Sequence, residues 1–315
     1  MKPEWIVLIV IGSILIVYLV CADVLYSRLF LRKHYKSVPF VDHTLPFFQP
    51  SKDWYDRSPK EEVSIRGYDG VKLTGVFLPS YDEKSTQTAI VLHGYQSQAS
   101  DMIVIGKMYN DMGFKVLLVN LRGHGESEGD FTTFGHYEKQ DLKKWIHFAL
   151  RTYGSTDKIL LHGVSLGAAM VMLSQTTNIP ENVKLIVADC GFTTLTKMLI
   201  HNIKPRILLL FLPGINLFTY YNHRFLLSSV SPLKAVVKGR IPLFIYHGTA
   251  DSIIPFSMGT TLVEASKAPF KELYPIENAE HAQGYVVDKP GLEKRIFELV
   301  CKYFTIKKSV MKQMK

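Results

Sequence analysis

Cysteine is scarce in this sequence, with only Cys21, Cys190 and Cys301 among 315 residues. The three are widely separated, so no CxxC pair indicates a zinc site and no disulfide framework is predicted. Internal repeats, low-complexity tracts, zinc-finger spacing and the aromatic-basic signature of RNA-binding modules are also lacking. The net charge is nevertheless +9. Much of the excess lies near the two ends of the chain, so a membrane surface explains it better than a nucleic acid, and we expect no nucleic-acid partner.

The sequence opens with a long apolar run. Residues 5–22 read WIVLIVIGSILIVYLVCA, carry no charge and are long enough to cross about 30 Å of hydrocarbon as a helix. A cleaved signal peptide is the alternative, but its positive region would be only Met1 and Lys2 and the run exceeds a typical signal core. A lipoprotein site would need a small residue where Val20 precedes Cys21. We therefore expect one N-terminal transmembrane helix within an anchor and basic juxtamembrane segment at residues 1–36.

Basic residues follow the apolar run more densely than they precede it. The positive-inside rule places such a flank in the cytoplasm, and the opposite orientation stays open because the N-terminus is short. The flanking residues are Arg28, Arg32, Lys33 and Lys36, against Lys2 before the run. The tail at residues 306–315 is also basic, and we interpret it as solvated in preference to lipid-bound.

Apolar strands and amphipathic helices alternate after a proline-rich linker at residues 37–60. Such alternation predicts an α/β domain, at residues 61–305, with a mainly parallel sheet covered by helices on both faces. The predicted strands are 62–65, 71–78, 88–92, 114–120, 158–162, 183–188, 242–246 and 271–275. The predicted helices are 101–112, 137–152, 165–174, 255–267 and 291–304.

One connection is far longer than the others. About fifty residues separate the strands ending at 188 and beginning at 242, and they include the apolar run Ile207–Pro213, which is too short to span a bilayer. We expect an inserted helical lid at about residues 192–240. The run either contacts an apolar substrate or simply covers the core.

A serine stands between two glycines where a predicted strand passes directly into a helix: Gly163-Val164-Ser165-Leu166-Gly167. A sharp strand-to-helix turn that exposes a serine hydroxyl needs small neighbours, because side chains at Gly163 and Gly167 would collide with the backbone. The helix N-terminus also directs N–H groups towards developing negative charge. Ser165 is therefore the candidate nucleophile.

A serine nucleophile needs a base, and the base needs an orienting acid. His281 follows the last predicted strand, and Asp251 follows the strand before it, which gives the chain order serine, acid, histidine. We predict that Ser165 attacks, His281 transfers the proton and Asp251 orients the imidazole. Asp189 is the competing acid, whereas Asp288 follows His281 and violates the order.

A tetrahedral intermediate also needs hydrogen-bond donors for its oxyanion. We predict the backbone N–H groups of Leu166 and Tyr95 for this role, since Gly94 allows the loop after residues 88–92 to approach closely. His93 is expected to hydrogen-bond within that loop and not to act as a second base.

Together these motifs resemble the alpha/beta-hydrolase superfamily, especially its membrane-anchored, serine-aminopeptidase-like and BEM46-like members, over residues 61–304. The segment Asn120-Leu121-Arg122-Gly123-His124-Gly125-Glu126-Ser127 adds to the likeness, although relatives often have Asp where Asn120 stands. The resemblance implies an eight-stranded sheet, a lid after the sixth strand and no cofactor. We predict a serine hydrolase that cleaves an ester or related acyl bond, and the apolar lid and the anchor suggest an acyl or lipid-like substrate. A serine peptidase and a non-catalytic membrane-attached binding protein are the alternatives, and the oligomeric state is left open.

Overall fold

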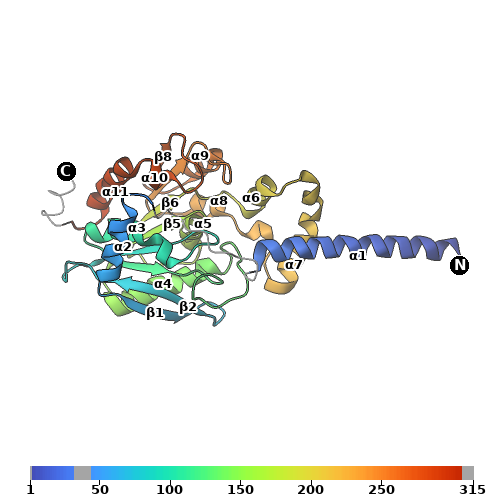
Figure 1. The fold of residues 1–315 in the computed structure, drawn as a ribbon, viewed down its shortest axis with the longest axis horizontal. Helices are drawn as coiled ribbons and strands as arrows, with labels where there is room; N and C mark the ends of the chain where they lie inside the picture. The colour runs from blue at the N-terminus through green and yellow to red at the C-terminus, as the bar shows by residue number, and fades with distance from the viewer. Residues whose placement is uncertain (1, 32–43, 307–315) are drawn as a thin grey trace.

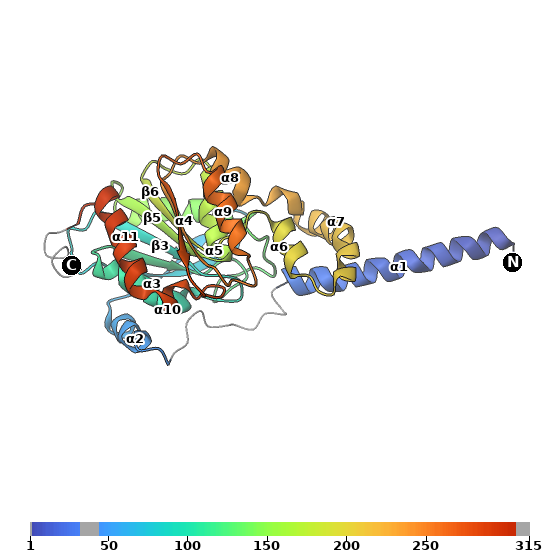
Figure 2. The same ribbon diagram turned by 90° about the horizontal axis from the view of Figure 1, so that it is seen from above.

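The computed structural model describes residues 2–31 and 44–306. The predicted juxtamembrane residues Arg32, Lys33 and Lys36, the first part of the predicted linker and the basic tail at residues 307–315 lie outside these ranges. Figures 1 and 2 show a mixed α/β body from which one long helix, α1 (Pro3–Phe30), projects.

The body is built on one eight-stranded sheet, as the resemblance implied. Its spatial order is β1-β2-β4-β3-β5-β6-β7-β8; β1 and β2 pair antiparallel, β2 and β4 pair antiparallel, and all other neighbours are parallel. The strands are β1 (Glu61–Arg66), β2 (Lys72–Leu78), β3 (Gln87–Leu92), β4 (Lys115–Val119), β5 (Lys158–Val164), β6 (Val183–Asp189), β7 (Leu243–Gly248) and β8 (Lys271–Ile276). The predicted strands match these to within two residues at each end.

Helices cover both faces of the sheet, because the central strands are apolar on both sides. In β3, Ile90 and Leu92 join one hydrophobic core, while Ala89 and Val91 join the other. The first core lies under α4 (Glu138–Tyr153), α5 (Leu166–Leu173), α8 (Pro232–Lys238) and α9 (Phe256–Ala265). The second lies under α2 (Phe48–Arg57), α3 (Ile103–Asp111) and α11 (Lys289–Tyr303). Short elements complete the body: the 3₁₀ turns η2 (Ala99–Met102) and η3 (Ser174–Thr176), and α10 (Gly284–Val287).

Part of the segment predicted as a linker is helical. Helix α2 begins at Phe48, and Pro50 is tolerated because it lies in the first turn, where backbone N–H groups have no helical partner. Phe48 and Ser51 are buried, and the Trp54 indole donates to the Asn110 side chain of α3 at 3.1 Å. Phe48 and Trp54 therefore attach this segment to the body, although its prolines favoured the interpretation as a linker.

The connection between β6 and β7 is helical, as predicted, and we call residues 192–240 the insert. It contains α6 (Leu195–Asn202), η4 (Arg206–Phe211), α7 (Leu212–His223), η5 (Leu227–Ser229) and α8. In both views α6 and α7 lie beside the C-terminal end of α1, away from the sheet (Figures 1 and 2). Helix α1 has 28 residues and is long and apolar enough to cross a membrane by length and composition.

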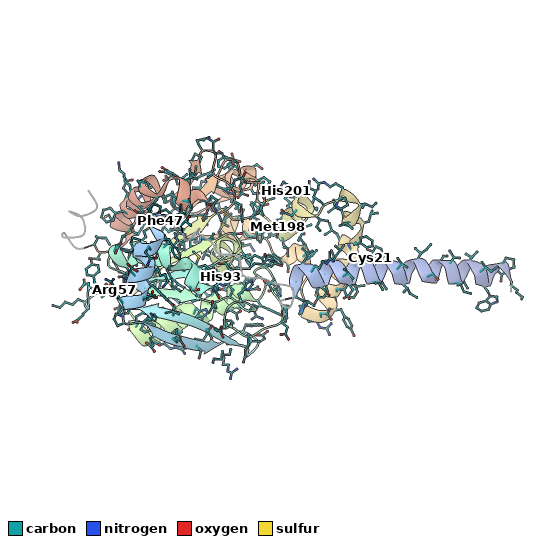
Figure 3. The ribbon with its side chains drawn as sticks, viewed as in Figure 1. Cys21, Phe47, Arg57, His93, Met198 and His201 are labelled. Carbon is teal, nitrogen blue, oxygen red and sulfur yellow. The ribbon has the colours of Figure 1, made fainter. Side chains whose placement is uncertain are left out.

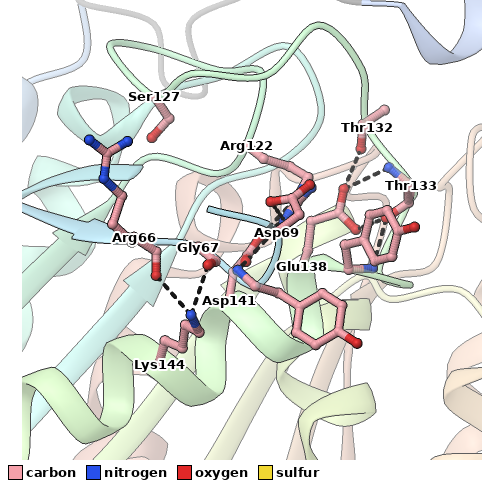
Figure 4. Close-up of polar contacts among 12 residues, drawn as sticks. Arg66, Gly67, Asp69, Arg122, Ser127, Thr132, Thr133, Glu138, Asp141 and Lys144 are labelled. Atoms are coloured by element: carbon pink, nitrogen blue, oxygen red, sulfur yellow. Dashed lines mark hydrogen bonds and ion pairs between the residues drawn. The ribbon is translucent and has the colours of Figure 1, made fainter. Parts of the chain in front are cut away.

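A buried arginine secures the loop between β4 and α4, close to the carboxyl ends of the strands. Arg122 forms paired hydrogen bonds to the carboxylates of Asp141 and Asp69, at 2.8–3.2 Å (Figure 4). The same loop contains Asn120, whose side chain accepts from the Ala99 N–H and donates to the Thr74 hydroxyl. The Asn120 side chain thus links the start of η2 to β2.

Candidate active site

Ser165 lies on a strained turn between β5 and α5. Its φ of 54° is in the left-handed region, which a side chain rarely adopts. The turn is feasible because the residues two positions before and after Ser165 are glycines. A Cβ on Gly163 would lie 2.2 Å from the Gly167 carbonyl group, and one on Gly167 would lie 2.5 Å from the Leu92 oxygen. The backbone N–H of Ser165 donates to the Asp189 carbonyl at 2.8 Å, which fixes the turn at the sheet edge.

The structure brings Ser165, His281 and Asp251 into one hydrogen-bonded chain. His281 Nε2 lies 2.9 Å from Ser165 Oγ, and His281 Nδ1 lies 2.8 Å from Asp251 Oδ2. A carboxylate accepts, so Nδ1 carries the imidazole proton and Nε2 is free to accept from the serine hydroxyl. This is the arrangement that activates a serine nucleophile.

Asp251 is held in its ionised form. Its Oδ1 accepts the backbone N–H groups of Ile253 and Ile254 at 2.9 and 2.7 Å. Burial acts to raise the pKa of Asp251, but hydrogen bonds from His247 and His281 outweigh it and hold the pKa well below its usual range. The carboxylate therefore stays ionised near neutral pH, where it orients His281.

A second histidine, which the sequence motif did not single out, contacts the same carboxylate. His247 Nε2 lies 2.8 Å from the Ile254 carbonyl and 3.2 Å from Asp251 Oδ2. Both neighbours are acceptors, so Nε2 carries the proton and donates to both. The only sequence signal for His247 is its place in β7, four residues before Asp251.

Asp189, the competing acid, has no hydrogen bond to His281 among the described residues. It is buried at the end of β6, and its Oδ2 has no hydrogen-bond partner within the described parts of the chain. Burial raises the pKa of Asp189 to about 7, against the smaller opposing effects of His281 and His247.

We expect Asp189→Asn to flatten the pH dependence of stability. Between about pH 4 and 7 the folded state keeps a proton on Asp189 that the unfolded chain has lost, so stability falls as pH rises through this window. In the wild type this proton lowers the free energy of unfolding by about 1.4 kcal/mol for each pH unit of rise. Asparagine does not titrate, so the variant should not show this decrease. Urea unfolding of the full chain in detergent at several pH values measures this, with the exposed Asp130→Asn as control. Equal slopes in Asp189→Asn and the wild type would contradict the assignment.

The loop after β3 approaches the nucleophile closely, as predicted. A Cβ on Gly94 would lie 3.4 Å from the Ser165 Cβ. His93 is fully buried, accepts the Leu121 N–H at Nε2 and lies 2.7 Å from the Gly94 carbonyl at Nδ1. Burial, together with the nearby His124, holds the pKa of His93 well below its ordinary value, so His93 is a neutral bridge inside the body (Figure 3).

The residues of the two predicted oxyanion donors line the same cavity. Leu166 is the first residue of α5, where backbone N–H groups have no helical acceptor. Tyr95 and Leu166 both line a cavity with Ser165 and His281. The Tyr95 hydroxyl donates to the Leu29 carbonyl of α1 at 3.0 Å, which links this loop to the long N-terminal helix.

The cavity above Ser165 has a volume of about 620 Å³, within the range of small-molecule sites. The insert contributes Met198, Leu199, Ile203 and Leu208 to its wall, and α1 contributes Leu25 and Leu29. Figure 3 places Met198 on the side of the body that faces α1. The charged residues lining the cavity are Arg28 and Lys204, both exposed; no aspartate or glutamate lines it within residues 2–31 and 44–306.

Cys190, Asp251 and His281 have ligand atoms within 4.8 Å of one another. A metal there would compete with the hydrogen bonds that orient His281. Burial also raises the pKa of the Cys190 thiol well above its ordinary value, which disfavours the thiolate that metals require. The donor set therefore fits the serine–histidine chain better than a metal ion.

Comparison with known proteins identifies the family of this chain. Residues 23–204 match the model of the X-Pro dipeptidyl-peptidase (S15) family. The chain belongs to this family. Uncharacterized protein YqkD of Bacillus subtilis is 28% identical over 240 residues, which cover 75% of this chain and 77% of YqkD. The S15 match confirms the predicted superfamily and makes the chain a serine hydrolase.

Solved structures show the same alpha/beta-hydrolase fold. Esterase Pf2001 of Pyrococcus furiosus aligns with a TM-score of 0.66 and 24% identity, covering 86% of this chain and 100% of the esterase. A puromycin-hydrolyzing peptidase of Mycobacterium tuberculosis aligns with a TM-score of 0.62 and 15% identity, covering 79% of this chain and 40% of that protein. Since one of these similar proteins is an esterase and the other a peptidase, the fold does not choose between the two bonds.

Proposed function

We propose that this S15-family chain is a membrane-anchored carboxylester hydrolase that forms an acyl-enzyme on Ser165. The observation that carries the proposal is the position of His281, within hydrogen-bonding distance of both Ser165 Oγ and Asp251 Oδ2. His281 takes the serine proton as Oγ attacks the carbonyl, and the N–H groups of Tyr95 and Leu166 bind the oxyanion. The alcohol leaves with the proton from His281, and water then hydrolyses the acyl-enzyme by the same route.

The cavity favours an apolar acyl ester over a peptide with a free amino terminus. A peptide cut near its N-terminus brings an ammonium group into the site, and burying that charge without a carboxylate costs several kcal/mol. The charged residues lining the cavity are instead the cations Arg28 and Lys204. The S15 family name supports a serine peptidase as the second candidate, but the charge of the described cavity lining opposes it.

A matched substrate set tests this preference. We expect kcat/KM for octanoyl p-nitroanilide to exceed that for glycyl-prolyl p-nitroanilide by about 100-fold, since the dipeptide carries an uncompensated ammonium group. Acetylation of the dipeptide removes the charge and should recover part of the loss, while p-nitrophenyl octanoate reports ester cleavage directly. Preference for the free dipeptide would establish a dipeptidyl peptidase instead.

We also propose that α1 is an uncleaved single-pass anchor and that the hydrolase domain is cytoplasmic, as the basic residues after the span suggest. A protease added to intact cells should leave a C-terminally tagged domain whole, and the same protease should digest it after lysis. Digestion in intact cells would reverse the orientation.

A further inference from the structure

The middle of the insert, where η4 passes into α7, packs on α1 at a point well inside the apolar run. The Tyr18 ring stacks on Phe211 with the ring centroids 5.2 Å apart. Its hydroxyl donates to the Leu210 carbonyl at 3.2 Å and accepts the Gly214 N–H at 3.1 Å. A Cβ on Gly214 would lie 2.6 Å from the Ala22 Cβ, so the backbones of α1 and α7 approach closely there. Figures 1 and 2 both show α7 against the C-terminal part of α1.

Charge fixes the depth of this contact if α1 crosses a bilayer. The uncharged stretch between Glu4 and Asp23 extends over about 27 Å of helix at 1.5 Å per residue, close to the thickness of the hydrocarbon layer. The stretch has little freedom to slide in either direction, because a shift would bury a carboxylate. Tyr18 precedes Asp23 by five residues, or about 7 Å of helix. The residues that touch Tyr18 therefore lie inside the hydrocarbon boundary.

The composition of this part of the insert suits that depth. Between Arg206 and Arg224 no residue is Asp, Glu, Lys or Arg. Ile207, Leu210 and Leu217 are 62%, 63% and 54% exposed, and Tyr221 is 71% exposed. Neighbouring large apolar side chains that protein leaves uncovered mark a contact surface. Since the contacts of Tyr18 join this surface to the apolar run of α1, the occupant that fits is lipid.

We propose that η4 and α7 form a second membrane contact, embedded in the leaflet from which α1 emerges, and that the catalytic cavity therefore opens at the level of the lipid headgroups. This proposal rests on the membrane anchoring by α1 proposed above. The cavity-lining residues of α1, Leu25, Arg28 and Leu29, follow Asp23 directly and so lie just beyond the hydrocarbon boundary. The substrate is then an ester-bearing amphiphile that enters from the leaflet.

Arg28 and Lys204 fit the same geometry. They come from α1 and from the insert, line the cavity, and neither has an ion-pair partner among residues 2–31 and 44–306. Cations at headgroup depth can pair with lipid phosphates while their side-chain stems stay in the apolar layer.

Depth-sensitive labelling of the full chain tests the membrane contact. A Leu217→Cys variant in a Cys21→Ser/Cys301→Ser background is labelled with the fluorophore NBD and placed in phosphatidylcholine–phosphatidylglycerol nanodiscs, with Tyr81→Cys as the control on the hydrolase body. We expect NBD at 217 to be quenched by lipids with nitroxide-labelled tails and protected from aqueous dithionite, and NBD at 81 to show neither effect. Equal dithionite reduction at both sites overturns the proposal. So does protection at 217 without lipid quenching, which indicates a second protein copy on this surface.

An activity measurement links the contact to substrate entry. Leu210→Asp/Leu217→Asp places two carboxylates in the proposed contact, and Tyr81→Asp/Val237→Asp places two on exposed sites outside η4 and α7. The measured quantity is kcat/KM for a bilayer-resident acyl ester divided by kcat/KM for the soluble ester p-nitrophenyl butanoate. We expect the first variant alone to lower this ratio, by about tenfold or more. An unchanged ratio overturns entry from the leaflet.

Labelling of Ser165 by a fluorophosphonate confirms that each variant is folded. Absence of ester turnover and of labelling in the wild type would instead defeat the proposed hydrolase function, while the nanodisc measurement would still decide the membrane contact.

Discussion

Replacing Ser165 by alanine is expected to lower kcat/KM for p-nitrophenyl octanoate by about 10⁵-fold, leaving only the residual catalysis of the surrounding groups. The alanine removes the one hydroxyl that His281 Nε2 contacts at 2.9 Å. It should fold, because Ser165 uses its backbone N–H, which alanine keeps, to bond the Asp189 carbonyl. Fluorophosphonate labelling of the wild type, followed by mass spectrometry, should place the adduct on residue 165.

The matched control for this variant is Ser252→Ala, which removes an exposed hydroxyl hydrogen-bonded to Glu280. The control should label and turn over as the wild type does. If Ser165→Ala retains labelling, the nucleophile is another residue and the proposed mechanism is wrong.

Asp251→Asn is expected to lower kcat by about 10⁴-fold with little change in KM. The amide oxygen can keep the two backbone N–H bonds of Ile253 and Ile254, and the amide NH₂ then faces His281 Nδ1. A donor at that position forces the proton of neutral His281 onto Nε2, which can no longer accept from Ser165. His247 Nε2, which lies 3.2 Å from Asp251 Oδ2 in the wild type, also loses its charged acceptor.

Steady-state kinetics of the full chain across pH 6–9 would measure this effect, with Glu280→Gln as control. Glu280 is exposed and adjacent in sequence to His281, so the control removes a neighbouring negative charge without touching the imidazole. If Asp251→Asn keeps more than about a tenth of the wild-type kcat, another group orients His281.

Much of the fold could be predicted because its signals are local. Continuous apolar stretches such as 159–161 are buried on both faces, and a sheet covered by helices is the arrangement that accommodates them. The helix predicted at 101–112 is instead a 3₁₀ turn followed by α3, a difference confined to its first residues. Helix α2 was not predicted, since Pro50 is a breaker in most contexts and only the packing of Phe48 and Trp54 on the body offsets it.

The candidate site could be predicted from the sequence only for those residues that directly follow a strand. Ser165 and His281 were identified because each follows a recognisable strand, and parallel strands bring their carboxyl ends to one edge. The acid was ambiguous for the same reason, since Asp189 and Asp251 both follow strands of that sheet. Only the tertiary structure distinguishes them, because Asp251 lies within hydrogen-bonding distance of His281, whereas Asp189 is buried and has no hydrogen bond to His281 among the described residues.

The sequence by itself determined the alternation of strands and helices, the glycine-flanked serine turn and an apolar span without charge, because each is encoded by neighbouring residues. Only the tertiary structure decided that His247 shares the Asp251 carboxylate and that Leu25 and Arg28 of the anchor helix line the catalytic cavity. The contact of Tyr18 with Leu210 joins residues 192 positions apart. Such a contact leaves no periodic pattern in either segment, because it depends on how the folded elements pack and not on the propensity of either one.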